Sequence, residues 1–248
     1  MTNKQPPQLD TPVEVELRPI VPSATLTDDP RLAAQLDFLQ RVGHLTQVLR
    51  RSRVADGRGG DRRENAAEHS WQAGLAVLLL AEHADEPIDA AHAAVLMLVH
   101  DVVEVEAGDT FIFDATASAT IEQREAAALE RLVEGLPSDQ ADWLRDLQAE
   151  YVAQLTPESR FGKAVDRLLP QLLHLQRKGK PWITHGITRE QTDAVWRTIA
   201  TGSTTLAEVS RAIQEAAIAE GWIADPPDHG RASPTVPHAP AVRARAHN

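Results

Sequence analysis

Residues 99–110, VHDVVEVEAGDT, close the apolar run AAVLMLV (residues 93–99) with a histidine and a carboxylate. The run is good material for a buried helix, yet His100 and Asp101 stand side by side at its end, and Glu104 and Asp109 follow. Burying such polar groups without partners costs free energy. They must therefore satisfy one another, or another group such as a metal ion must satisfy them.

The composition is that of an ordinary globular protein, because 42% of the 248 residues are apolar and 25% are charged. No apolar run approaches the roughly 20 residues that span a bilayer, and the first ten residues, MTNKQPPQLD, do not form a signal peptide. We expect a cytoplasmic protein that does not enter membranes. The net charge of −11 argues against binding to nucleic acid polymers. Since cysteine is absent, any metal must be held by His, Asp and Glu.

The chain between its two ends reads as helix after helix. Residues 1–28 are rich in proline and aperiodic, and residues 225–248 hold five prolines. We expect a flexible N-terminal segment over 1–28, one helical domain over 29–224 and a disordered tail over 225–248. Alternating strand patterns are nearly absent, so the predicted fold class is all-α, a single helical bundle.

Local signals predict where the helices begin. Asp29 and Pro30 are typical of the start of a helix, here expected over residues 28–50. Thr156 begins a later helix, and Thr188 with Gln191 forms a capping-box pattern. Two strongly apolar helices are expected between these, over residues 67–84 and 89–105. Four tryptophans are expected in the core: Trp71, Trp143, Trp182 and Trp196.

Polar groups interrupt three of the expected helices. On a continuous helix, Glu104 would share a face with His100 and Asp101. His69 lies at the start of an apolar helix, and Asp166 is surrounded by apolar residues in FGKAVDRLLPQLL. Imidazole and carboxylate ligands suit Mn²⁺, Co²⁺, Fe²⁺ or Zn²⁺, so one metal site would explain all three interruptions.

Separate structural roles are the alternative explanation for these residues. His69 would cap a helix, His100 would pair with Asp101, and Asp166 would bridge to Arg167 or Lys163. His174 and His185 are expected to be structural, with a place in a pocket wall as the alternative. A further feature is the segment 50–63, RRSRVADGRGGDRR, whose six arginines could cradle a small anion or simply form a solvated loop.

Three motifs in this order, ENAAEHSW (64–71), HDVVEVEAGD (100–109) and AVDRLLP (164–170), resemble those of the HD-domain metal-dependent phosphohydrolases. The resemblance covers about residues 35–220 and is closest to the branch that contains the 5'-deoxynucleotidases. It implies one divalent cation (Mn, Co, Fe, Zn or Mg) and the hydrolysis of a (deoxy)nucleoside 5'-monophosphate to nucleoside and phosphate. The ligands that it implies are His69, His100, Asp101 and Asp166.

The resemblance also implies roles around the metal. Glu104 would be the catalytic glutamate, Asp109 a second acid of the site, and Arg50, at the end of the first helix, a contact to the substrate phosphate. We expect Arg53 or Arg63 to assist Arg50. The sequence departs from the branch at Arg51, where tryptophan is frequent, and this leaves the exact substrate open.

Two other functions are compatible with this sequence. An HD enzyme acting on a nucleoside triphosphate or a signalling nucleotide is one alternative, and a non-catalytic helical protein stapled by the metal is another. Similar enzymes commonly form dimers, so we expect a homodimer.

Overall fold

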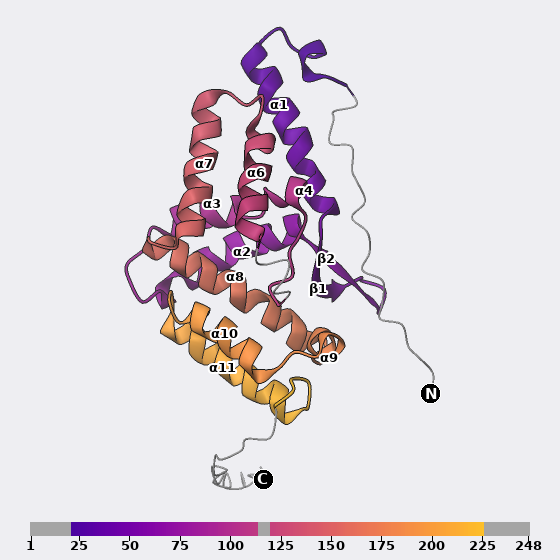
Figure 1. Ribbon diagram of the computed structural model, residues 1–248, viewed down its shortest axis with the longest axis vertical. Helices are drawn as coiled ribbons and strands as arrows, with labels where there is room; N and C mark the ends of the chain where they lie inside the picture. The colour runs from indigo at the N-terminus through magenta and orange to yellow at the C-terminus, as the bar shows by residue number, and fades with distance from the viewer. Residues whose placement is uncertain (1–20, 114–119, 226–248) are drawn as a thin grey trace, which may run out of the picture.

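The computed structural model describes residues 21–113 and 120–225. Within these residues the chain forms a bundle of helices with a two-stranded hairpin at one side (Figure 1), which confirms the predicted all-α class. Most of the two predicted tails, residues 1–20 and 226–248, lies outside the described part. No described helix is long and apolar enough to cross a bilayer.

The elements follow one another in this order: η1 (Ser23–Thr25), α1 (Pro30–Val42), η2 (Gly43–Gln47), β1 (Leu49–Ala55), β2 (Asp61–Asn65), α2 (Ala66–Leu80), η3 (Ala81–His83), α3 (Ala90–Val99), α4 (Glu104–Ala107), α6 (Ile121–Val133), α7 (Ser138–Ala153), α8 (Pro157–Gln176), α9 (Lys180–His185), α10 (Arg189–Ile199) and α11 (Thr204–Ala219).

Helix α8 is the centre of the core. It contacts α2, α3, α7, α10 and α11 (Figure 1), and its apolar face is fully or almost fully buried at Phe161, Val165 and Leu168. Met97 of α3 lies so close to Gly162 that a Cβ there would stand 3.1 Å from the methionine Cε atom. The interior is therefore close-packed where α3 crosses α8.

Side-chain caps fix where the helices begin. The carboxylate of Asp29 accepts hydrogen bonds from two backbone N–H groups of α1, and the hydroxyl of Thr156 accepts one at the start of α8. The predicted capping box of Thr188 with Gln191 is confirmed. A second capping box, which was not predicted, joins Asn65 to Glu68 and starts α2, so that His69 lies in the first turn.

Two predicted helices are wrong in extent. The helix expected over residues 28–50 ends at Val42, and the chain continues through η2 into β1, so Arg50 lies in a strand and not at the end of a helix. The helix expected over residues 89–105 ends at Val99, and Glu104 begins the separate short helix α4.

Residues 21–28, which the sequence assigns to the flexible N-terminal segment, contain η1 packed on α1. Ser23 is fully buried, its backbone N–H donates to Oδ1 of Asp37 at 3.0 Å, and Nε2 of Gln40 donates to its hydroxyl. The remaining domain boundaries stay predictions.

Candidate metal centre

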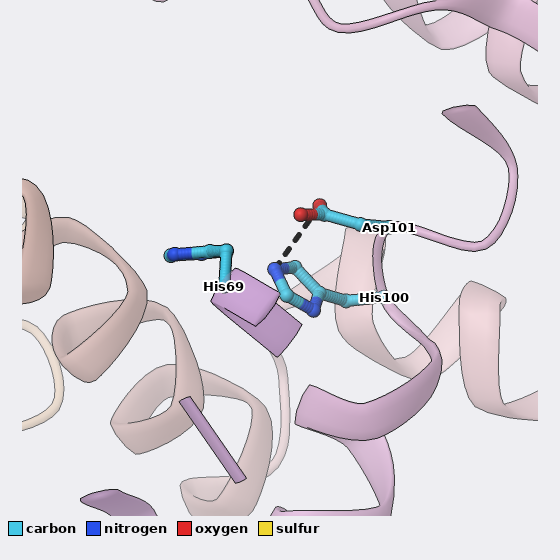
Figure 2. Close-up of side chains that lie close together, drawn as sticks. All are labelled: His69, His100 and Asp101. Atoms are coloured by element: carbon cyan, nitrogen blue, oxygen red, sulfur yellow. Dashed lines mark ion pairs between the residues drawn. The ribbon is translucent and has the colours of Figure 1, made fainter. Parts of the chain in front are cut away.

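Four side chains from three places in the sequence meet beside α8. Nε2 of His69 lies 3.1 Å from Oδ1 of Asp166, and Nε2 of His100 lies 3.8 Å from the same oxygen and 3.1 Å from Oδ1 of Asp101. Figure 2 shows His69 beside the His100–Asp101 ion pair, and ligand atoms of these three residues lie within 4.8 Å of one another. All four side chains are buried. The predicted ligands are thus brought together.

The second nitrogen of each histidine faces a protein acceptor. Nδ1 of His100 lies 2.8 Å from the carbonyl oxygen of Met97, and Nδ1 of His69 lies 3.8 Å from Oε1 of Glu64. A ligating histidine ordinarily donates its other N–H to such an acceptor, so that the lone pair of Nε2 is free for a metal. His100 is within hydrogen-bond distance of its acceptor, whereas Nδ1 of His69 has no hydrogen-bond partner among the described residues.

Unpartnered buried atoms indicate that the centre takes a ligand. Oε2 of Glu104 is buried and has no hydrogen-bond partner among residues 21–113 and 120–225, and Nε2 of His100 makes no hydrogen bond there although it lies 3.1 Å from Oδ1 of Asp101. Leaving such atoms unsatisfied costs free energy. Two imidazoles and two carboxylates are a donor set that suits Mn²⁺, Fe²⁺, Co²⁺ or Zn²⁺, so the residues fit a divalent cation.

The two aspartates are held in the charged form that metal binding needs. Burial by itself would raise the pKa of the Asp166 carboxyl, but the charges of Arg167 and Lys163 hold it well below its usual range. Burial also opposes ionisation of Asp101, and there the charges of His100 and Arg50 lower the pKa.

A tyrosine that was not predicted supports Asp166, together with Lys163, which the sequence offered as an ion-pair partner of this aspartate. The hydroxyl of Tyr151, on α7, donates to Oδ2 of Asp166 at 3.0 Å, and Nζ of Lys163 donates to the tyrosine oxygen at 2.9 Å. Burial lowers the pKa of Lys163 to about 8. The only sequence signal was that Tyr151 is the single tyrosine of the chain.

The hairpin brings a buried arginine–glutamate pair to the centre. Nη1 of Arg50, on β1, donates to Oδ2 of Asp101 at 2.8 Å, and its Nε lies 3.3 Å from Oε2 of Glu64 on β2. Glu64 is 1% exposed and was not predicted as a site residue. The only signal for Glu64 in the sequence is its place at the start of the motif ENAAEHSW, because the run DRREN is otherwise typical of a solvated charged segment.

Arg53 and Arg63 stabilise the hairpin of β1 and β2, and neither lines the neighbouring cavity. Nε of Arg53 donates to Oδ1 of Asp61 at 2.7 Å. Nε of Arg63 donates to the carbonyl oxygen of Arg50 at 2.7 Å, and its Nη2 donates to that of Leu49. These contacts do not support the expected role in phosphate binding. Arg63 instead fixes the backbone that carries Arg50.

Glu104 reaches the centre through a tight turn instead of along a helix. Its backbone N–H donates to the carbonyl oxygen of Asp101 at 2.9 Å, a bond that spans three residues. Burial, together with the charges of Asp101 and Asp109, raises the pKa of Glu104 well above its usual value. Burial is also the largest cause that raises the pKa of Asp109.

A cavity opens next to these residues. Its wall contains three arginines, several aromatic rings and both histidines whose role the sequence left open: Arg50, Arg51, Ser52, Asp109, Thr110, Phe111, Ile112, Phe113, Arg167, Pro170, His174, Pro181, Trp182, His185 and Ile187. The rings of Phe111 and His185 lie 4.8 Å apart between centroids. Burial lowers the pKa of His174 to about 4, so this histidine is neutral at pH 7.

Pro170 stands in the wall of the cavity and inside α8. It lies four residues after Asp166 and has no N–H, so the carbonyl oxygen of Asp166 receives no hydrogen bond of the regular helical pattern.

These features define a helical protein with a candidate metal centre built on an adjacent His–Asp pair. The sequence profile described as "HD domain" matches residues 42–207. The chain belongs to the HD domain family.

Similar proteins include one of known structure. The crystal structure of a predicted metal-dependent phosphohydrolase from Magnetospirillum magnetotacticum MS-1 is 41% identical, with a TM-score of 0.73, and the match covers 79% of this chain and 97% of that one. The 5'-deoxynucleotidases HDDC2 of Xenopus laevis and Bos taurus are 30% and 32% identical over 132 residues, which is 53% of this chain. The match spans 63% and 62% of their own lengths, less than two thirds.

Proposed function

We propose that this protein is a metal-dependent phosphohydrolase that converts a (deoxy)nucleoside 5'-monophosphate and water into nucleoside and inorganic phosphate. One observation carries the proposal: two histidines and two aspartates meet at a buried point next to a cavity whose wall contains three arginines. The names of the related proteins support the same class of reaction. A cytoplasmic location stays a prediction.

The proposed ligands of a single divalent cation are His69, His100, Asp101 and Asp166. A divalent cation supplies two things to such a reaction, because it lowers the pKa of a water molecule and polarises a phosphoryl oxygen. Tyr151 and Lys163 hold Asp166 in place, and Oε1 of Glu64 lies 3.8 Å from Nδ1 of His69.

Arg50 and Arg167 are the positive groups of the cavity nearest to the centre, since each faces one of the proposed aspartate ligands. We assign to Arg50 the role of orienting the phosphate and offsetting its charge in the transition state. The attacking water forms a bond to phosphorus while the ester P–O bond breaks, and the proton of the water ends on the leaving oxygen. Glu104, with Asp109 behind it, holds or moves that proton.

A panel of substrates tests the proposed function. The purified protein is freed of metal, supplied with Mn²⁺, Co²⁺ or Mg²⁺, and given deoxynucleoside and ribonucleoside monophosphates, triphosphates and signalling nucleotides. We expect release of inorganic phosphate from the 5'-monophosphates and none in a chelator. Release of pyrophosphate or triphosphate from triphosphates would support the alternative enzyme. A folded, metal-loaded protein that releases nothing from any substrate would support the metal as a structural staple.

We propose a homodimer, supported by an apolar stripe on α2. The stripe consists of Trp71, Leu75, Leu78 and Leu79, which are 43–67% exposed and lie four, seven and eight residues after the first, on one helix face. Trp71 was expected in the core, and this is wrong. Trp143 is also exposed, whereas Trp182 is buried as expected. Helix α2 is apolar on most sides, so only part of it can face α3 and α8.

Replacing Leu79 by glutamate is expected to convert the dimer into a monomer, because a charge would have to be buried in an apolar interface. Light scattering over a wide concentration range measures the mass. Leu155→Glu is the matched control, since Leu155 is 81% exposed and lies outside the stripe. A wild-type protein of monomer mass at every concentration would contradict the dimer, and a dimeric Leu79→Glu variant would exclude the stripe as its interface.

A further inference from the structure

Three consecutive residues of β1 line the cavity: Arg50, Arg51 and Ser52. In a regular strand successive side chains point to opposite faces, so neighbours would not share a cavity wall. The pairing with β2 is irregular at this place. Between the pairs Leu49↔Asn65 and Arg53↔Arg63, β1 advances by four residues while β2 advances by two. Such irregularities turn side chains away from the regular alternation, and here the result is two adjacent arginines in one wall.

The two arginines differ in how their charge is used. The guanidinium of Arg50 pairs with Asp101 and Glu64. The guanidinium of Arg51 forms no hydrogen bond and no ion pair with any residue in the described ranges 21–113 and 120–225, although this side chain is half-buried. Arg51 is therefore a positive charge in the cavity wall that forms no ion pair with the described residues.

None of the other charged groups that the structure describes in the cavity wall forms an ion pair with Arg51. Arg167 lies 3.6 Å from Oδ2 of Asp166, so its guanidinium has a counter-charge. Asp109 is the only carboxylate among the lining residues of the described ranges. It forms no ion pair with Arg51, although the charge of Arg51 is one of the smaller causes that lower the pKa of Asp109, after burial, which raises it. After burial, the charge of Arg51 is a further cause that lowers the pKa of His185. The side of the cavity near Arg51 and His185 is thus positive and lacks a fixed anion.

We propose that Arg51 binds a second anionic group of the substrate, so that the preferred substrate is a nucleotide with one phosphate more than the one that is hydrolysed. This inference rests on the proposed function and extends its substrate class to nucleotides that carry a second phosphate. A guanidinium pairs with phosphate through two parallel hydrogen bonds, which makes arginine well suited to this role. The tryptophan that is frequent at this position in the related branch could pack against a nucleoside but could not pair with an anion.

Three matched nucleotides test the proposal: deoxyadenosine 5'-monophosphate, deoxyadenosine 3',5'-bisphosphate and deoxyadenosine 5'-diphosphate. The metal-loaded enzyme is assayed with each, at constant ionic strength, and the products are separated by chromatography. We expect kcat/KM for at least one doubly phosphorylated nucleotide to exceed that for the monophosphate by about tenfold or more, the usual scale of a hydrogen bond to a charged group. Comparing the two doubly phosphorylated compounds shows whether the second phosphate is recognised on the 3' oxygen of the sugar or next to the 5' phosphate.

Arg51→Gln should abolish this preference while the monophosphate is still hydrolysed, and Arg51→Lys should retain part of it. Arg58→Gln is the matched control, because Arg58 lies in the same hairpin, is exposed and does not line the cavity. A second readout needs no turnover. Calorimetric binding of the 3',5'-bisphosphate and the 5'-diphosphate to the metal-free protein should weaken about tenfold in Arg51→Gln for the preferred one.

Two results would overturn the inference. One is a wild-type enzyme that hydrolyses the monophosphate as well as both doubly phosphorylated nucleotides. The other is a preference that remains unchanged in Arg51→Gln. If no nucleotide is hydrolysed at all, the proposed function fails instead, and the binding measurement still decides whether Arg51 holds a second phosphate.

Discussion

Replacing Asp166 by alanine is expected to remove the bound cation and the hydrolytic activity together. Oδ1 of Asp166 lies near both histidines, 3.1 Å from Nε2 of His69 and 3.8 Å from Nε2 of His100. Loss of groups that merely support metal ligands typically costs roughly 10- to 100-fold in affinity or activity, so loss of a ligand should cost on the order of 10²-fold or more. Metal analysis after dialysis and the phosphate-release assay measure the two effects.

A second variant separates loss of metal from loss of fold. Asp166→Ala leaves Lys163 and Arg167 without their buried counter-charge, which by itself could unfold the protein. Asp166→Asn keeps the shape of the side chain and an acceptor for Tyr151. Asp139→Asn is the control, because Asp139 forms an exposed ion pair with Arg31. A folded Asp166→Asn protein with wild-type metal content and turnover would contradict the assignment.

Replacing Glu104 by glutamine is expected to lower turnover by ~10²-fold or more, the usual scale of general acid–base catalysis, while the metal stays bound. Glu104 is 7% exposed, and its Oε2 has no partner among the described residues. Glutamine keeps the shape of the side chain but can neither accept nor release a proton near neutral pH. Steady-state kinetics with the best substrate of the panel, together with metal analysis, measure the effect.

Glu106→Gln is the matched control for this experiment. Glu106 lies on the same short helix α4 but pairs with Arg41 and Arg131, away from the proposed ligands. Its replacement should leave turnover close to that of the wild type. If Glu104→Gln loses the metal, Glu104 is a ligand and its proposed role is wrong. If Glu104→Gln turns over at the wild-type rate, the residue takes no part in the reaction.

The sequence indicated the proposed ligands in two ways, because polar groups interrupt apolar helices and because the motifs that carry them resemble those of one family. His69, His100 and Asp166 each interrupt an apolar helix, and such groups need partners. Local capping signals were equally readable, and the starts of α1 and α8 at Asp29 and Thr156 are confirmed. Both kinds of signal lie within a few neighbouring residues, so no knowledge of distant contacts was required.

The hairpin and its contribution to the site could not be predicted in this way. The strand LRRSRVA lacks an alternation of apolar and polar residues, and contacts distant in sequence hold it in place. Asp61 pairs with Arg53 and also with Lys180 of α9, and Arg63 donates to backbone carbonyl groups of β1. These contacts hold the hairpin in which Glu64 is buried.

The end of α3 depends on a distant partner as well. Nε2 of Gln148, on α7, donates to the carbonyl oxygen of Val99 at 2.6 Å and to that of His100. Carbonyl groups at the end of a helix need such partners. The glutamine thus helps the chain to leave the helix at Val99, and this turn places Asp101 and Glu104 at the centre, which the apolar pattern of α3 alone could not indicate.

Pro170 lowers the stability of this protein, because it lies inside helix α8. A proline inside a helix costs about 3 kcal/mol or more relative to a residue with an N–H, and natural proteins possess only a small reserve of stability. Replacing Pro170 is therefore the strongest candidate for a thermostabilising substitution in α8. This residue lines the cavity and lies four residues, about one helical turn, after Asp166. We expect selection for heat resistance to replace Pro170 early. The variants that result should be assayed for loss of activity, because gains in stability next to a reactive site commonly reduce function.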